Sequence, residues 1–258
     1  MVRVIVCACM LAMAAGGLAQ PRPPQPHVSL GQDGKLAYVA QPNGDRVPDF
    51  STCGYMAGDV AIPDAPLVVV VEPVAGDNTA RIQAAIDHAA TLKTDGPRAV
   101  LLRKGRYEVQ GALRITASNV VLRGSGAGED GTVLVATGTD RRTLINIAGR
   151  DDRQVGLGVA VTDKYVPVNA TRFSVSAGHG LKVGDNVTVR RPATAQWIAA
   201  LGMTTLGGER HGFSWRPGSR EVAWDRTVTR VEGDVINIDS PVTTALDAQY
   251  GGGSVAAY

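Results

Sequence analysis

The chain has 258 residues, of which 44% are hydrophobic, and it carries 26 Lys and Arg against 24 Asp and Glu. This length allows one large domain or two small ones. The near balance of charge argues against a nucleic-acid partner, because such proteins present a basic surface to phosphates.

The first 19 residues are typical of a cleaved secretory signal peptide. Arg3 precedes the apolar run VIVCACMLAMAAGGLA, and the small residues Gly17 and Ala19 lie near its end. The run is short for a membrane span. We therefore expect a secreted or periplasmic protein with no membrane attachment after cleavage. Two of the three cysteines leave with the signal, so Cys53 lacks an intrachain partner, and we expect a buried structural thiol there.

Residues 20–27, QPRPPQPH, form a Pro-rich leader that favours extended polyproline II. Residues 28–72 hold short strand-like pieces, and we expect them to form an arm along the first turns of the fold that follows. Residues 77–93, DNTARIQAAIDHAATLK, have the spacing of an amphipathic helix that Asp77 can cap. The apolar stripe of this helix consists of Ile82, Ala85, Ile86, Ala89 and Leu92.

The segments after the helix are rich in β-branched and aliphatic residues and end at Gly or polar turns. They are AVLLRKGRYEVQG, ALRITASNVVLRG, GTVLVATG and RTLINIAG. No second helix pattern lies between them, which argues against βαβ winding. Strands that follow one another through short turns fit a parallel β-helix, in which each coil of about 20–25 residues adds a rung to one core. The preceding helix would then cap the open end of the stack.

The same residues resemble the first segment of secreted pectate-lyase-like proteins, which are right-handed parallel β-helices. The resemblance covers roughly residues 45–150 and departs at Lys104, where Pro is usual. The matching positions are Asp77, Thr79, Ile82, Gln83, Ala85, Ile86, Asp87, Gly105, Tyr107, Asn119, Val120, Leu122 and Gly124.

The resemblance implies a protein that acts on polysaccharide, and leaves the reaction open. A polysaccharide lyase would cleave a uronate-containing glycan by β-elimination, in which a base removes the proton next to the carboxylate. A glycoside hydrolase with paired carboxylates and a non-catalytic glycan-binding or adhesion protein are the alternatives. We expect an acidic polysaccharide as the partner and a monomeric protein, and the sequence assigns no catalytic residue.

Residues 155–245 change pattern and predict a small antiparallel β lobe, inserted between coils or placed beside them. Alternation in residues 186–190 and 235–239 puts apolar groups on one face and polar groups on the other. Gly184 and Gly233 supply tight turns. Residues 28–154 are then assigned to the arm, the cap helix and the first coils. Residues 246–258 are assigned to the start of a continuation missing from the chain, because no closing cap is evident there, and a short β-helix whose second cap is the lobe is the alternative. The predicted fold is all-β: a right-handed parallel β-helix with an N-terminal capping helix and this lobe.

The lobe also gathers the three tryptophans of the chain near several arginines. Aromatic faces stack on sugar rings, and Arg forks bind carboxylates through two hydrogen bonds. A lobe core filled by tryptophan is the alternative explanation. The substrate-binding candidates are Trp197, His211, Trp215 and Arg216.

Other motifs are weaker. Residues 126–131 match Gly-x-Gly-x-x-Gly, but a strand pattern follows where a dinucleotide site needs a helix, so a turn between rungs is predicted. His179 in SAGHGLKVGD is expected to be structural. No transition-metal spacing exists. The acid pairs Asp151-Asp152 and Glu129-Asp130 offer at most a weak Ca²⁺ site, and solvated turns are the alternative.

Overall fold

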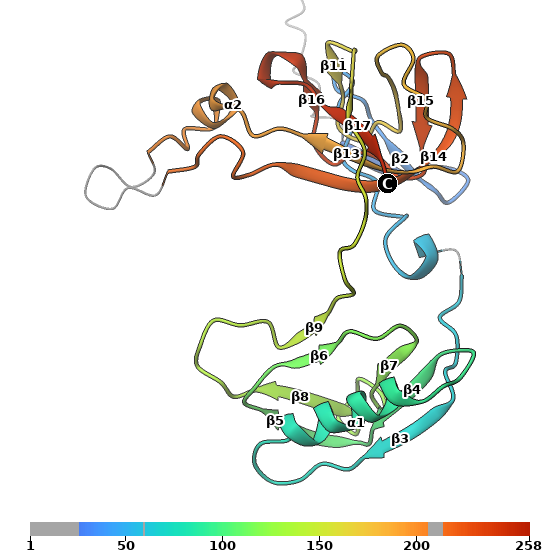
Figure 1. Ribbon diagram of the computed structural model, residues 1–258, viewed down its shortest axis with the longest axis vertical. Coiled ribbons are helices and arrows are strands. Elements are labelled where there is room, and N and C mark those ends of the chain that lie inside the picture. The colour runs from blue at the N-terminus through green and yellow to red at the C-terminus, as the bar shows by residue number, and fades with distance from the viewer. Residues whose placement is uncertain (1–25, 59, 206–213) are drawn as a thin grey trace, which may run out of the picture. The chain divides into compact units, whose positions relative to one another are not determined.

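The computed structural model describes residues 26–58, 60–205 and 214–258, so the expected signal peptide and most of the Pro-rich leader lie outside it. The described chain is mostly β, with few helices (Figure 1). It divides into two compact units. The coil unit is Phe50–Gly156, and the lobe unit combines Leu157–Ala257 with the described residues up to Asp49. No helix in the described ranges is both long and apolar enough to cross a membrane.

The coil unit passes through three short sheets and then returns to each of them. Strands β4, β5 and β6 pair in parallel with β7, β8 and β9 respectively, and β3 adds a further parallel strand beside β4. The chain therefore makes successive coils, with two or three strands in each described sheet. The elements are β3 (Leu67–Val71), α1 (Thr79–Thr91), β4 (Arg98–Leu102), β5 (Gly105–Val109), β6 (Leu113–Ile115), β7 (Val120–Arg123), β8 (Thr132–Ala136) and β9 (Ile145–Ile147).

The predicted helix is present as α1, which packs against β3, β4, β6 and β7. Four members of its predicted stripe are buried, while Leu92 is half-buried just past the helix end. The side chain of Asp77 accepts hydrogen bonds from the backbone N–H of Thr79 (3.0 Å) and of Gln110 (3.0 Å). These hydrogen bonds lower the pKa of Asp77, led by the one from Gln110. Asp77 thus ties the start of α1 to the end of β5.

The lobe unit contains a six-stranded antiparallel sheet in the order β10-β17-β13-β14-β15-β12. Its core includes Val187, Val189, Trp224, Ile236 and Val255. The predicted turns are present, since Gly184 and Gly233 both adopt positive φ. The elements are β1 (Val28–Leu30), β2 (Leu36–Tyr38), β10 (Val159–Ala160), β11 (Tyr165–Val166), β12 (Arg172–Ser174), β13 (Asn186–Arg191), α2 (Ala195–Ala200), β14 (Val222–Glu232), β15 (Val235–Ile238), β16 (Leu246–Asp247) and β17 (Ser254–Ala257).

Two predicted boundaries need correction. The arm up to Asp49 belongs to the lobe unit instead of lying along the coils, because Asp45 accepts hydrogen bonds from the Tyr165 hydroxyl (2.8 Å) and the Val168 backbone (2.8 Å). Residues 246–257 are also part of the lobe, because β17 pairs with both β10 and β13.

The prediction for Cys53 also needs correction. Cys53, expected to be buried, is exposed.

Candidate functional site

Two of the three tryptophans form a stacked pair on the lobe unit. The ring centroids of Trp197 and Trp215 lie 5.7 Å apart with an interplanar angle of 30°. Both side chains are half-buried. Trp224 is instead part of the core, where its Nε1 donates to Thr243 Oγ1 at 3.0 Å. The explanation that tryptophan fills the lobe core therefore applies to Trp224, and the stacked pair stays a candidate for sugar contact.

Each ring of the pair also contacts a guanidinium group. Arg191 Cζ lies 4.1 Å from the ring centroid of Trp197, and Arg220 Cζ lies 5.4 Å from that of Trp215. Cation–π contacts of this kind are favourable at such distances. We call these four residues the Arg–Trp cluster.

The two arginines of the cluster differ in environment. Arg191 is 5% exposed, and its Nε donates to Ala245 O at 3.2 Å. Its Nη1 is buried and has no hydrogen-bond partner among the residues that the structure describes. Burial lowers the pKa of Arg191, while the negative charge of Asp247 raises it. Arg220 is exposed, and its Nη1 donates to the adjacent Ser219 O at 2.9 Å. Arg191 is thus a fixed support, and Arg220 is an accessible cation.

Local hydrogen bonds hold the two tryptophans of the cluster, which lie on α2 and on the segment before β14. Thr194 caps α2 by accepting from Trp197 N (3.2 Å), and its hydroxyl donates to Tyr250 O (2.9 Å). The backbone N–H of Trp215 donates to Met203 O at 3.0 Å. In Figure 1, α2 lies beyond the paired ends of β13 and β14. The ring of Trp197 is therefore held on α2, and Trp215 is tied to the turn that follows this helix.

Three of the four predicted contact residues can be located. The structure brings Trp197 and Trp215 together, and Arg216, the next residue after Trp215, lies in an exposed turn closed by Ser219. His211 lies outside the described residues. The prediction missed the contribution of Arg191. The sequence of β13 could have indicated that Arg191 is buried, because Arg191 lies at the same alternate positions as Val187 and Val189, which are both buried.

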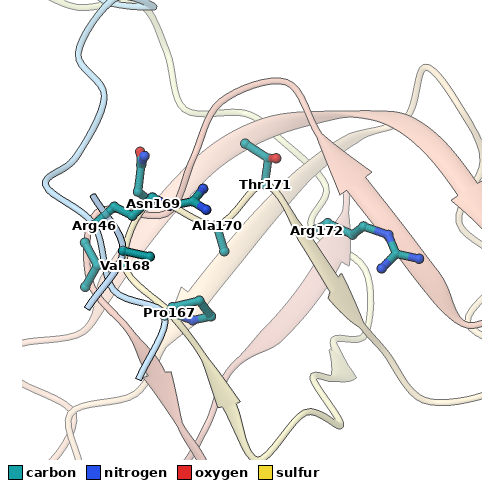
Figure 2. A pocket seen from close by; sticks show the side chains of 9 residues that line it. Arg46, Pro167, Val168, Asn169, Ala170, Thr171 and Arg172 are labelled. Carbon is teal, nitrogen blue, oxygen red and sulfur yellow. The ribbon is translucent and has the colours of Figure 1, made fainter. Parts of the chain in front are cut away.

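A separate hollow of about 380 Å³ lies where the arm meets the segment between β11 and β12 (Figure 2). Arg46 and Asn169 lie near each other there, and Arg172 points away. Asn169 adopts a positive φ of 71°, and its Oδ1 accepts from Asp49 N at 2.8 Å. Arg172 forms an ion pair with Glu232 at 3.6 Å. We assign this hollow to the attachment of the arm, because Asn169 bonds to the backbone of Asp49, the Arg46 backbone N–H donates to Val168 O, and Arg172 pairs with Glu232.

The remaining motifs have structural explanations. Residues 126–131 lie in the connection between β7 and β8. His179 accepts from Leu181 N through Nδ1 (2.9 Å), and its Nε2 lies 3.1 Å from Gly233 O. The Asp151 carboxylate accepts from Arg153, which lowers its pKa. Within residues 26–58, 60–205 and 214–258, no group of three or more His, Cys, Asp or Glu side chains is arranged to hold a metal ion.

Comparisons with known proteins assign no family. No protein-family model matches the chain, and no curated protein matches it. Among solved structures, similarity is found to the Gp54 tailspike of Acinetobacter baumannii bacteriophage AP22 in complex with A. baumannii capsular saccharide (9% identity, TM-score 0.31, 71% of this chain and 24% of that chain). The Pseudomonas phage phi297 tailspike gp61 gives 16% identity, a TM-score of 0.33, and coverage of 68% and 24%.

The tailspike protein gp49 from Pseudomonas phage LKA1 gives 16% identity, a TM-score of 0.30, and coverage of 70% and 25%. The chain spans about a quarter of the length of these structures. Similarity at this level establishes neither the fold nor the function of the chain. The pectate-lyase-like resemblance accordingly stays an expectation from the sequence.

Proposed function

We propose that this chain is an exported polysaccharide-binding protein of the parallel β-helix type, and that its ligand is an acidic glycan. The observation that carries the proposal is the Arg–Trp cluster, Arg191, Trp197, Trp215 and Arg220. The cluster combines flat apolar faces with permanent positive charge. These are the two properties that recognise a sugar ring bearing a carboxylate.

The order of contacts suggests how a ligand would enter. Trp197 is held against buried Arg191 and against Trp215. The arginine over Trp215 is exposed Arg220, and a cation–π contact at an exposed site is worth only about 0.5–1 kcal/mol. A sugar ring can therefore displace Arg220 from Trp215 at small cost. The released guanidinium would then pair with the carboxylate of the same sugar.

Binding is the function that these groups support directly, because stacking and charge pairing require no proton transfer. Cleavage of the glycan, by β-elimination or hydrolysis, is the finer alternative. The two reactions differ in product. Elimination creates an unsaturated uronate that absorbs ultraviolet light, and hydrolysis creates reducing ends without that absorbance.

The proposal is tested by calorimetric titration of the purified protein with acidic and neutral polysaccharides. We expect acidic glycans to bind, and Trp215→Ala to weaken binding at least tenfold, which corresponds to about 1.4 kcal/mol. Arg220→Gln should weaken binding of acidic glycans selectively. Arg230→Gln is the matched control, because Arg230 is an exposed arginine near the other end of β14, paired with Glu232. Unchanged affinity in Trp215→Ala would rule out the Arg–Trp cluster as the binding surface.

A further inference from the structure

Three parallel strands of the coil unit, β3, β4 and β7, end side by side, and we call the place where they end the corner. Val71 of β3 pairs with Leu102 of β4, and Leu101 of β4 pairs with Arg123 of β7. Continuing this register places the residues that follow the strands, Glu72, Arg103 and Ser125, on successive rungs. The register thus builds a polar ladder along the corner.

The corner is hollowed. A cavity of about 540 Å³ is lined by Glu72, Pro73, Arg103, Lys104, Ser125 and Asp130. This volume lies within the usual range of small-ligand sites, about 300–1,000 Å³. It lies wholly within the coil unit, on different residues from the Arg–Trp cluster.

Part of the lining is fixed by internal contacts. Arg103 Nε and Glu72 Oε1 form an ion pair at 2.8 Å, although both side chains are about 60% exposed. The Ser125 hydroxyl donates to Leu102 O at 2.9 Å, and the Ser125 backbone N–H donates to Thr132 Oγ1 at 2.8 Å. The serine and the ion pair therefore define one wall of the cavity.

The other two charged side chains of the lining belong to Lys104 and Asp130. Lys104 and Asp130 are exposed and line the same cavity, yet neither forms an ion pair within the described parts of the chain. An ammonium group can only donate hydrogen bonds and a carboxylate can only accept them. A pair of sugar hydroxyls satisfies both, because each hydroxyl both donates and accepts. The four charged groups sum to zero, so the cavity has no net attraction for an anion.

We propose that this corner cavity is a second glycan site, and that it takes a neutral, hydroxyl-rich sugar between Lys104 and Asp130. The inference rests on the proposed function in one respect, that the protein binds glycan. It adds a neutral component to the ligand, whereas the Arg–Trp cluster takes an acidic one. The protein would then recognise a glycan that contains both kinds of sugar, or two different glycans.

The test is calorimetric titration of the full protein with neutral malto-, cello-, xylo- and galacto-oligosaccharides, and in parallel with oligogalacturonate. We expect at least one neutral series to bind, and Asp130→Asn and Lys104→Gln each to weaken that binding at least fivefold. Lys93→Gln and Asp95→Asn are the matched controls, because both positions are exposed in the coil unit and neither lines the cavity. Circular dichroism checks that every variant is folded.

The outcomes separate this inference from the proposed function. Loss of neutral-sugar binding in the two cavity variants, with oligogalacturonate binding retained, supports the second site. Neutral-sugar binding that survives both variants overturns it. Absence of binding by every neutral series also overturns it, and the Arg–Trp cluster is then judged by Trp215→Ala and oligogalacturonate alone.

Discussion

Asn78 is predicted to be the most sensitive polar residue of the coil unit. It is fully buried just before α1. Its side-chain amide donates to Val74 O (3.0 Å) and Gly76 O (2.8 Å), and its Oδ1 accepts from Val74 N (3.1 Å). Asn78→Ala removes all three hydrogen bonds and leaves backbone groups without partners. At about 1 kcal/mol for each bond, the free energy of unfolding should fall by about 3 kcal/mol.

The loss of stability can be assigned to the coil unit, because two spectroscopic signals follow the two units differently. All three tryptophans lie in the lobe unit, so tryptophan fluorescence follows that unit, while far-ultraviolet circular dichroism follows both. In urea, Asn78→Ala should shift the circular-dichroism transition to lower denaturant and leave the fluorescence transition in place. Asn146→Ala is the control, because Asn146 is exposed in β9 and its loss should change stability by less than about 0.5 kcal/mol. A loss below about 1 kcal/mol in Asn78→Ala would refute the role given to these hydrogen bonds.

Two further predictions concern the lobe unit. Burial and then the Asp45 carboxylate raise the pKa of Tyr165 from 10.0 to about 12. Because the folded-state pKa is the higher one, this stabilisation is complete below pH 10.0 and is lost as pH rises toward 12. Urea denaturation between pH 10 and 12 should show that the wild type loses stability as the pH rises. An equal loss in Tyr165→Phe would show that the Tyr165 hydroxyl is not its cause. Gly251→Ala should destabilise the lobe by about 1–3 kcal/mol and disturb tryptophan emission, because φ is +103° and a Cβ would lie 2.6 Å from Thr194 Cγ2. Gly184→Ala has a similar φ but open space, so an equal effect there would show that backbone strain alone is responsible.

Local patterns predicted the elements that depend on local spacing. The 3.6-residue period of α1 placed Ile82, Ala85, Ile86 and Ala89 inside, and the structure buries all four. Alternation predicted the inward residues Ile236 and Ile238 of β15. The order of strands also predicted coils, and the parallel pairing of β4 to β6 with β7 to β9 agrees with it.

These local patterns did not predict contacts between residues that are far apart in the sequence. The arm was placed with the wrong unit, because its attachment depends on Asp45 meeting Tyr165, 120 residues away. Nothing near Asp45 in the sequence identifies that partner. The prediction that Cys53 is buried was also wrong. A thiol is hydrophobic, but long-range contacts decide whether the segment that carries it is packed against the rest of the protein.

The candidate site was predicted in composition but not in arrangement. Sequence proximity grouped all three tryptophans, and only the fold separates core Trp224 from the stacked pair. The cavity between Lys104 and Asp130 depends on parallel register, since the two residues belong to different coils. A single sequence contains no signal for that register beyond the repeat of apolar positions.

We propose that an acidic glycan binds on the Trp197–Trp215 pair. The most direct measurement is a titration of the wild-type protein with oligogalacturonate, followed by tryptophan emission, with Trp215→Ala titrated in parallel. We expect a saturable change in emission for the wild type, with the same midpoint as calorimetric binding, and we expect the variant to lose this change. Calorimetric binding without any change in emission would show that the ligand lies away from the stacked rings, and would exclude the Trp197–Trp215 pair as the binding surface.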